Sequence, residues 1–250
     1  MNLEVCVDSV ESAIASDKGG ATRVELCSAL SEGGITPSAG LMSAVRAAID
    51  IELFVIIRPR GGDFVYSDHE LQIMREDILE AKARKVDGVV LGVLTKAKTV
   101  DVARTHKLIE VARPLRVTFH KAFDVCKDLH RALEDVIASG ADRILTSGGQ
   151  PDAVRGAATI ALLQERAANR IRIMAGGGIR VSNLRTVALK TGVLEIHSSL
   201  SKNVDSDPAD ETPVIGNGPQ PFRVLERDVR TFKSALDAIA VEAQLGATAP

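Results

Sequence analysis

The sequence predicts a (β/α)8 barrel, a closed ring of parallel strands surrounded by helices. Short apolar segments with strand character begin near residues 3, 23, 52, 88, 116, 143, 172 and 194. Segments with helical periodicity separate each strand from the next, and strict alternation of strand and helix is typical of a parallel sheet. Eight such units in 250 residues match the size of the barrel.

An open, doubly wound sheet is the alternative architecture. Its first strand would lead into a G-x-G-x-x-G turn, which this chain lacks. Its strands would also be apolar on both faces. Here Glu, Cys, Thr and His alternate with apolar residues in the strands at 3–7, 24–27, 117–120 and 194–197. We expect the apolar faces, including Leu194 and Ile196, to contact the helices and the polar faces to line the lumen.

The helices follow from their periodicity and their caps. They are expected at 9–18, 38–48, 67–85, 100–112, 128–139, 153–168, 182–191 and 222–243. Asp128 and Ser182 are typical N-caps, and Gly140 and Gly192 are typical helix ends. We expect residues 1–250 to form one barrel domain.

Two segments break this rhythm. Four prolines and several acidic residues predict a polar loop at about 201–221, which is either a lid over the barrel mouth or a disordered insertion. The tail at 244–250 is expected to fray.

Composition narrows the possible functions. The net charge is −2, and the chain has no Trp and one Tyr, so we expect no nucleic-acid partner. The sequence has no uncharged apolar run of membrane-spanning length and no signal-peptide pattern, so we expect no membrane partner. Three cysteines do not suggest a disulfide framework and fit a reducing, cytoplasmic location.

Carboxylates gather on strands that would be neighbours in a closed barrel. Glu195, Glu4 and Glu25 lie on strands eight, one and two, where burial would require protons, cations or a metal ion. With His120, they are the candidate catalytic residues, acting as acids or bases or holding a divalent metal. Asp124 is expected to orient the His120 imidazole. A structural ion-pair network is the alternative.

Arginines and glycine loops predict a site for a small phosphorylated or carboxylated ligand. Arg58 and Arg60 are the expected counterions of the carboxylates, and guanidinium groups bind oxyanions through paired hydrogen bonds. Backbone N–H groups of glycine loops can hold an anion, although tight turns need glycine in any case. The candidate anion-binding residues are Arg58, Arg60, Ser147, Gly176, Gly177, Gly178 and His197.

Two cysteines form a candidate metal site. Cys6 and Cys27 follow Glu4 and Glu25 by two residues on adjacent strands. Because adjacent strands lie about 4.8 Å apart, both sulfurs could reach one ion if the register allows. Two thiolates suit a soft ion such as Cu(I) better than Mg²⁺ or Ca²⁺. Burial as strand filler is the alternative. Cys126 has no expected partner.

Seven motifs, in order over residues 1–200, resemble the CutC family. They are LEVCVDS (3–9), RVELC (23–27), GGITPS (33–38), IRPRGGDF (57–64), TFH (118–120), RILTSG (143–148) and GGGI (176–179). The resemblance implies a cytoplasmic TIM-like barrel that forms homo-oligomers, dimers or tetramers, and takes part in copper homeostasis. It also implies that Cys6 and Cys27 bind Cu(I). The chain departs from the family at Lys121, where Arg is usual, and in the polar insertion after Leu200.

Two functions stay open from the sequence. The first is a copper-binding protein of copper homeostasis. The second is an uncharacterised barrel enzyme that acts on a small anionic metabolite by acid–base or metal-assisted chemistry, such as isomerisation, epimerisation or an aldol reaction.

Overall fold

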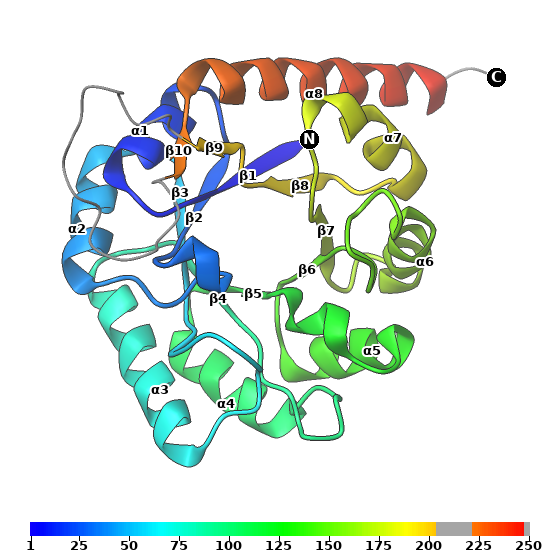
Figure 1. The fold of residues 1–250 in the computed structure, drawn as a ribbon. Coiled ribbons are helices and arrows are strands. Elements are labelled where there is room, and N and C mark those ends of the chain that lie inside the picture. Colours follow the sequence, from blue (N-terminus) through cyan, green and yellow to red (C-terminus); the bar gives the residue numbers. More distant parts are fainter. Residues whose placement is uncertain (204–221, 248–250) are drawn as a thin grey trace.

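Eight parallel strands close into a barrel in the computed structural model, which describes residues 1–203 and 222–247 (Figure 1). The strands pair in sequence order, and β8 pairs with β1 to close the ring. The predicted (β/α)8 barrel is therefore confirmed, because an open sheet would leave two unpaired edges. The strands are β1 (Asn2–Val7), β2 (Arg23–Leu26), β3 (Glu52–Ile56), β4 (Gly88–Leu91), β5 (Arg116–Phe119), β6 (Arg143–Thr146), β7 (Arg172–Gly176) and β8 (Glu195–Ser198).

Helices surround the barrel (Figure 1). They are α1 (Val10–Lys18), α2 (Ala39–Ala48), α3 (Asp68–Ala83), α4 (Val102–Ala112), α5 (Leu129–Ser139), α6 (Ala157–Ala167), α7 (Val181–Thr191) and α8 (Glu226–Ala247). The last of these contacts both α7 and α1, and so completes the ring. Two short 3₁₀ helices, η1 (Leu30–Glu32) and η2 (Lys121–Val125), follow β2 and β5 at the carboxyl end of the barrel.

Capping residues fix several helix ends. The Asp128 side chain accepts hydrogen bonds from the backbone of His130 and Arg131, and α5 ends at Gly140 with φ at 88°. Gly192 ends α7 with φ at 64°. These predictions are confirmed, except that α7 begins at Val181, one residue before the expected N-cap.

The two faces of each strand separate as the alternation predicts. Leu3, Val5, Val24 and Ile196 are fully buried in the apolar layer beneath the helices. A smaller cluster fills the lumen and consists of Cys6, Cys27, Phe54, Ile56 and Val90. Leu194 differs from the prediction, because β8 begins one residue later and leaves Leu194 at the amino-terminal rim of the barrel, 56% exposed.

The chain after β8 also differs from the prediction. Ser201–Asn203 forms β9, which pairs antiparallel with β10 (Phe222–Val224), so the last helix starts four residues later than expected. Acidic side chains in the first turn favour this start, because they interact well with the helix dipole. The helix continues through residue 247, into the segment that was expected to fray. The expected lid or insertion falls mainly on residues 204–221, outside the described part of the chain.

Candidate functional site

The two lumen cysteines lie close enough to act together. Cys6 belongs to β1 and Cys27 directly follows β2, and their Sγ atoms are 3.7 Å apart. The register is shifted by two residues from the simplest expectation, because Cys6 lies beside Glu25. The sulfurs still approach each other, because Cys27 lies just beyond the end of β2, diagonally across from Cys6, and the two side chains point into the same lumen. Both cysteines are buried and neither forms a disulfide.

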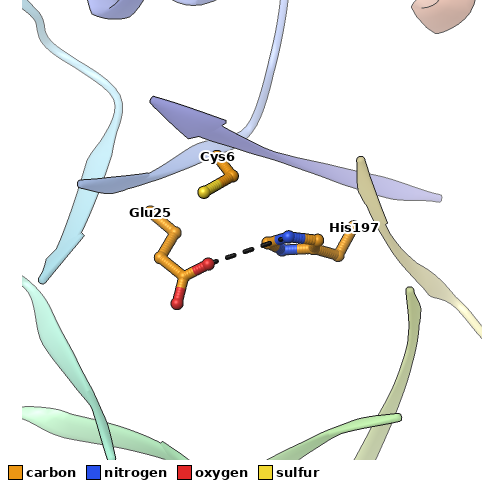
Figure 2. Close-up of side chains that lie close together, drawn as sticks. All are labelled: Cys6, Glu25 and His197. Atoms are coloured by element: carbon orange, nitrogen blue, oxygen red, sulfur yellow. Dashed lines mark ion pairs between the residues drawn. The ribbon is translucent and has the colours of Figure 1, made fainter. Parts of the chain in front are cut away.

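An imidazole and a carboxylate complete this group. Figure 2 shows Cys6, Glu25 and His197 pointing toward one another from β1, β2 and β8. Their candidate ligand atoms all lie within 4.8 Å of one another. Nε2 of His197 is 3.7 Å from Oε2 of Glu25. We call Cys6, Cys27, Glu25 and His197 the mouth cluster.

Burial and neighbouring charges shift the pKa values of the mouth cluster. Burial alone would lower the pKa of His197, but hydrogen bonding to Cys6 and Glu4 and the nearby carboxylates raise it well above its usual value, so the ring is an imidazolium. Burial raises the pKa of Glu25 to about 7. The hydrogen bond with Cys27 and burial raise the pKa of the Cys6 thiol well above its usual value.

Below the mouth cluster, Glu4 and Glu195 are paired with arginines. Glu4 bonds to Nε of Arg23 through Oε2, and Arg23 Nη2 donates to Glu195 at 2.9 Å. Arg143 donates to the same carboxylate from Nε at 2.6 Å. Burial opposes ionisation of both carboxylates, but these arginines keep their pKa values below the usual range. Both glutamates are therefore anionic members of a buried ion-pair network.

The prediction that Arg58 and Arg60 neutralise these carboxylates is wrong. Arg23 and Arg143 do so, and the sequence contained a signal for Arg23, which shares the parity of Glu25 on β2. Glu195 also lies at the first position of β8, at the amino-terminal end of the barrel. It lines a different cavity from His197.

A cavity of about 200 Å³ opens at the carboxyl end of the barrel. It is lined by Cys6, Glu25, Cys27, Gly33, Gly34, Ile56, Arg58, Phe64, His120, Lys121, Leu145 and His197. Candidate metal ligands, cations and apolar residues therefore share one space, in the position where barrel proteins carry their active sites.

His120 is a neutral imidazole on the wall of this cavity. Nδ1 accepts a hydrogen bond from the backbone N–H of Ala122 at 3.2 Å, so the proton resides on Nε2. Burial, with a contribution from Arg58, lowers the pKa of His120 to about 3. Nε2 is buried without a hydrogen-bond partner among the described residues. The ring is therefore set up to donate a hydrogen bond.

The expected pairing of His120 with Asp124 is wrong. The Asp124 carboxylate accepts hydrogen bonds from the backbone of Ser147 and Gly149 and from the hydroxyls of Thr146 and Ser147. The backbone donors of the loop after β6, predicted to hold a ligand anion, thus already hold a carboxylate of this chain. No sequence pattern predicts this pairing, because the two residues are 23 positions apart and follow different strands.

Arg58 reaches the cavity but its terminal nitrogens are engaged. Nη1 donates to the carbonyl oxygens of Glu32 and Gly34 at 2.7 and 2.9 Å, and Nη2 donates to that of Gly62 at 2.9 Å. The guanidinium therefore connects the loop after β2 with the loop after β3. It adds positive charge to the cavity wall but has no free pair of terminal donors for a ligand.

Arg60 lies away from the cavity. Its Nε donates to Glu70 at 2.5 Å and its Nη2 to Asp63 at 3.0 Å. It is not among the residues that line the cavity.

The glycine loop after β7 lies beside the cavity. A Cβ on Gly176 would lie 3.2 Å from Cβ of His197, and one on Gly177 would lie 3.2 Å from Nζ of Lys121. Gly178 has φ at 67°, which a residue with a side chain rarely adopts. These glycines allow the loop to pass close to the mouth cluster and Lys121.

These features define a class of protein: a (β/α)8 barrel whose carboxyl end holds two thiols, an imidazole and a carboxylate in one cavity. A sequence profile described as the CutC family matches residues 1–202. The chain therefore belongs to the CutC family.

Relatives and solved structures agree with this assignment. The human copper homeostasis protein cutC homolog is 48% identical over 204 residues, which cover 82% of this chain and 75% of that protein. A CutC family protein from Chromobacterium violaceum is 44% identical over 94% of this chain and 98% of its own length. The solved CutC structure from Streptococcus agalactiae has a TM-score of 0.76 at 37% identity and covers 80% of this chain and 98% of its own.

A more distant structure shares the fold alone. Thiamine phosphate pyrophosphorylase from Pyrococcus furiosus has a TM-score of 0.59 at 19% identity, over 95% of this chain and 96% of its own. Within the described ranges, no helix combines the length and apolar character needed to cross a membrane.

Proposed function

We propose that this protein binds Cu(I) in the cytoplasm as part of copper homeostasis, with Cys6 and Cys27 as thiolate ligands. The observation that carries the proposal is the distance of 3.7 Å between the two Sγ atoms. Metal–thiolate bonds are about 2.3 Å long for zinc, so two sulfurs at this separation can bind one ion of similar size. Thiolates prefer soft ions such as Cu(I).

The neighbours of the thiols support a third ligand. His197 lies close enough to Cys6 to share a metal ion with it, and Nε2 would be free for that ion only after the imidazolium loses the proton on Nε2, while Nδ1 keeps its bond to Glu4. Copper binding would therefore release protons from Cys6 and His197. Glu25, with a pKa of about 7, is close enough to accept one of them.

The cytoplasmic location is supported by the state of the cysteines. Cys6, Cys27 and Cys126 are all free, and a reducing compartment keeps thiols available for metal. The human relative carries the name of a copper homeostasis protein, which supports the same role here. From the family resemblance we further propose a homo-oligomer, a dimer or tetramer, which light scattering after size-exclusion chromatography tests.

The direct test is an anaerobic Cu(I) titration against a chromogenic chelator. The wild type is expected to bind one ion per chain, and the double variant Cys6→Ser/Cys27→Ser is expected to lose that ion. Cys126→Ser is the matched control, since Cys126 is a thiol outside the mouth cluster and should leave binding unchanged. Equal copper content in the wild type and the double variant would refute the thiolate site.

A second candidate is an enzyme that acts on a small phosphorylated or carboxylated metabolite in the same cavity. It is favoured by His120, whose buried Nε2–H meets no acceptor within the described ranges and could donate to a ligand oxygen. Arg58 and Lys121 add positive charge to the wall. Glu25 has a pKa near neutrality, which suits a general acid or base, alone or beside a divalent metal.

The enzyme proposal assigns His120 as a hydrogen-bond donor rather than a general base. A metabolite screen by ligand-detected NMR tests it, with wild type and His120→Phe compared. A ligand that binds the wild type and is lost in the variant would support it. Ligands that bind both proteins equally, or none at all, would argue against an enzyme at this cavity.

A further inference from the structure

A second cavity lies at the opposite end of the barrel. Its volume is about 630 Å³, larger than that of the cavity at the carboxyl end. We call it the basal cavity, and the charged residues that carry the argument are Arg23, Glu52, Arg116, Arg143, Arg172 and Glu195. The copper proposal and the enzyme proposal leave it without a role.

Positive charge exceeds negative charge in the basal cavity. Arg23, Arg116, Arg143 and Arg172 face only two carboxylates, Glu52 and Glu195.

Three further charged residues near the basal cavity do not reverse this balance. At its rim, Arg170 is paired with Glu134, and Asp142 is paired with Arg113. Glu4 shares its negative charge between Arg23 and the His197 imidazolium. Four guanidinium groups against Glu52, Glu195 and the shared Glu4 leave an excess of one to two positive charges.

The guanidinium nitrogens of the two buried arginines, Arg23 and Arg143, all donate to acceptors within the protein. Arg23 bonds to Glu4, Glu52 and Glu195. Arg143 donates to Glu195 from two nitrogens and to Thr118 Oγ1 from the third. These arginines explain the network inside the lumen, and the excess charge therefore resides on the other two.

Arg116 and Arg172 are the arginines with free donors. Arg116 gives one nitrogen to Glu52 at 2.6 Å, and its other nitrogens have no acceptor in the described part of the chain. The Arg172 side chain is exposed to solvent, and its guanidinium has no hydrogen-bond or ion-pair partner among residues 1–203 and 222–242.

The strand register brings the free arginines to one side of the opening. Arg143 and Arg172 are direct neighbours on β6 and β7, and Arg116 lies at the start of β5, on the other side of β6. Arg116 and Arg143 also both pack on the ring of Phe54, with each Cζ 5.4 Å from its centroid. Three adjacent strands therefore present guanidinium groups to one space.

We propose that the basal cavity binds a small oxyanion with two negative charges, a phosphate or a dicarboxylate, through Arg172 and Arg116. A guanidinium group binds such oxygens through paired, charge-assisted hydrogen bonds. The excess of positive charge and the free donors on two guanidinium groups favour a dianion over a monoanion. Phe54 and the Arg23–Glu4 pair separate this site from the mouth cluster, so it is a site of its own.

Isothermal titration calorimetry at low salt tests the proposal, with inorganic phosphate, succinate and acetate as the probes. Phosphate, succinate or both are expected to saturate one site, and preference between them identifies the oxyanion. Acetate, a monoanion, is expected to bind at least about tenfold more weakly, because it forms fewer charge-assisted bonds. The proposal is overturned if neither dianion binds saturably at millimolar concentration, or if acetate binds as well.

Variants locate the site. Arg172→Gln is expected to weaken dianion binding by about tenfold or more, and Arg116→Gln to weaken it as well. Arg131→Gln is the matched control, because it removes an exposed arginine from the outer helix α5 and should leave binding unchanged. Equal affinity in the wild type and Arg172→Gln would overturn the proposal. Arg172→Gln is expected to bind Cu(I) as the wild type does. The experiment therefore tests the oxyanion site independently of the proposed copper site.

Discussion

Nδ1 of His197 lies 2.7 Å from Oε1 of Glu4. This contact joins the mouth cluster to the buried ion-pair network below it. On one side, His197 belongs to the mouth cluster with the thiols. On the other side, the second carboxylate oxygen of Glu4 bonds to Arg23 of the buried ion-pair network. A continuous series of paired charges therefore runs along the lumen, and each member depends on its neighbours for compensation in a buried environment.

Glu4→Gln should destabilise the protein strongly. It removes the carboxylate that compensates both Arg23 and His197, and breaking a buried ion pair by removing one partner typically costs about 3–5 kcal/mol. Urea unfolding at neutral pH measures the loss. Glu76→Gln is the control, since Glu76 is exposed and pairs only at the surface, and it should change stability by less than about 0.5 kcal/mol. Similar unfolding midpoints for both variants would contradict this account.

Copper affinity should rise with pH. Metal and protons compete for Cys6 and His197, and the folded protein raises the pKa of both groups above their usual values. Raising the pH removes the competing protons, so the apparent affinity should increase by roughly tenfold per pH unit for each proton released. Chelator competition at a series of pH values near neutrality measures it. A pH-independent affinity would show that these groups are not the ligands.

His120 should reduce stability in acid. Its folded pKa is about 3, below the usual histidine value of about 6.5, so the unfolded chain takes up a proton between these values while the folded protein does not. This contribution to stability is complete above the unfolded pKa and falls by about 1.4 kcal/mol per pH unit below it. The difference between the wild type and His120→Gln, measured by urea unfolding, should therefore shrink as the pH falls.

A surface histidine provides the control for the acid experiment. His69 lies exposed on α3, and His69→Gln should follow the wild type at every pH. If the stability difference between the wild type and His120→Gln stays constant with pH, the buried neutral imidazole is not responsible.

Gly88→Ala should be destabilising because β4 and Phe54 pack without space between them. A Cβ at Gly88 would lie 2.4 Å from the Phe54 ring, and relieving such overpacking costs typically about 1–3 kcal/mol. Gly40→Ala is the opposite case, since Gly40 lies in α2, a Cβ there would have Ser38 Oγ at 3.9 Å as its nearest neighbour, and alanine favours the helix. Thermal unfolding should show a lower midpoint for the first variant and an equal or higher midpoint for the second.

The sequence by itself determined the barrel, the inward and outward faces of its strands, and the presence of the thiol pair. Alternation fixes which face a residue occupies, since side chains change sides at every position of a strand. It therefore placed Cys6 and Cys27 in the lumen with Glu25 and His197. The family motifs, which lie within the profile match over residues 1–202, were also visible in the sequence.

Only the tertiary structure decided how far along the barrel each side chain lies and which groups meet there. Strands of a closed barrel are staggered, so residues at equal distances from their strand starts lie at different heights. This stagger places Glu195 in the basal cavity with Arg143, while His197 reaches Cys6. The loops bring the Asp124 carboxylate to the backbone N–H of Ser147. The hydrogen bond to His120 Nδ1 comes instead from a backbone N–H. Because alternation carries no information on height or on loop contacts, these pairings required the closed barrel itself.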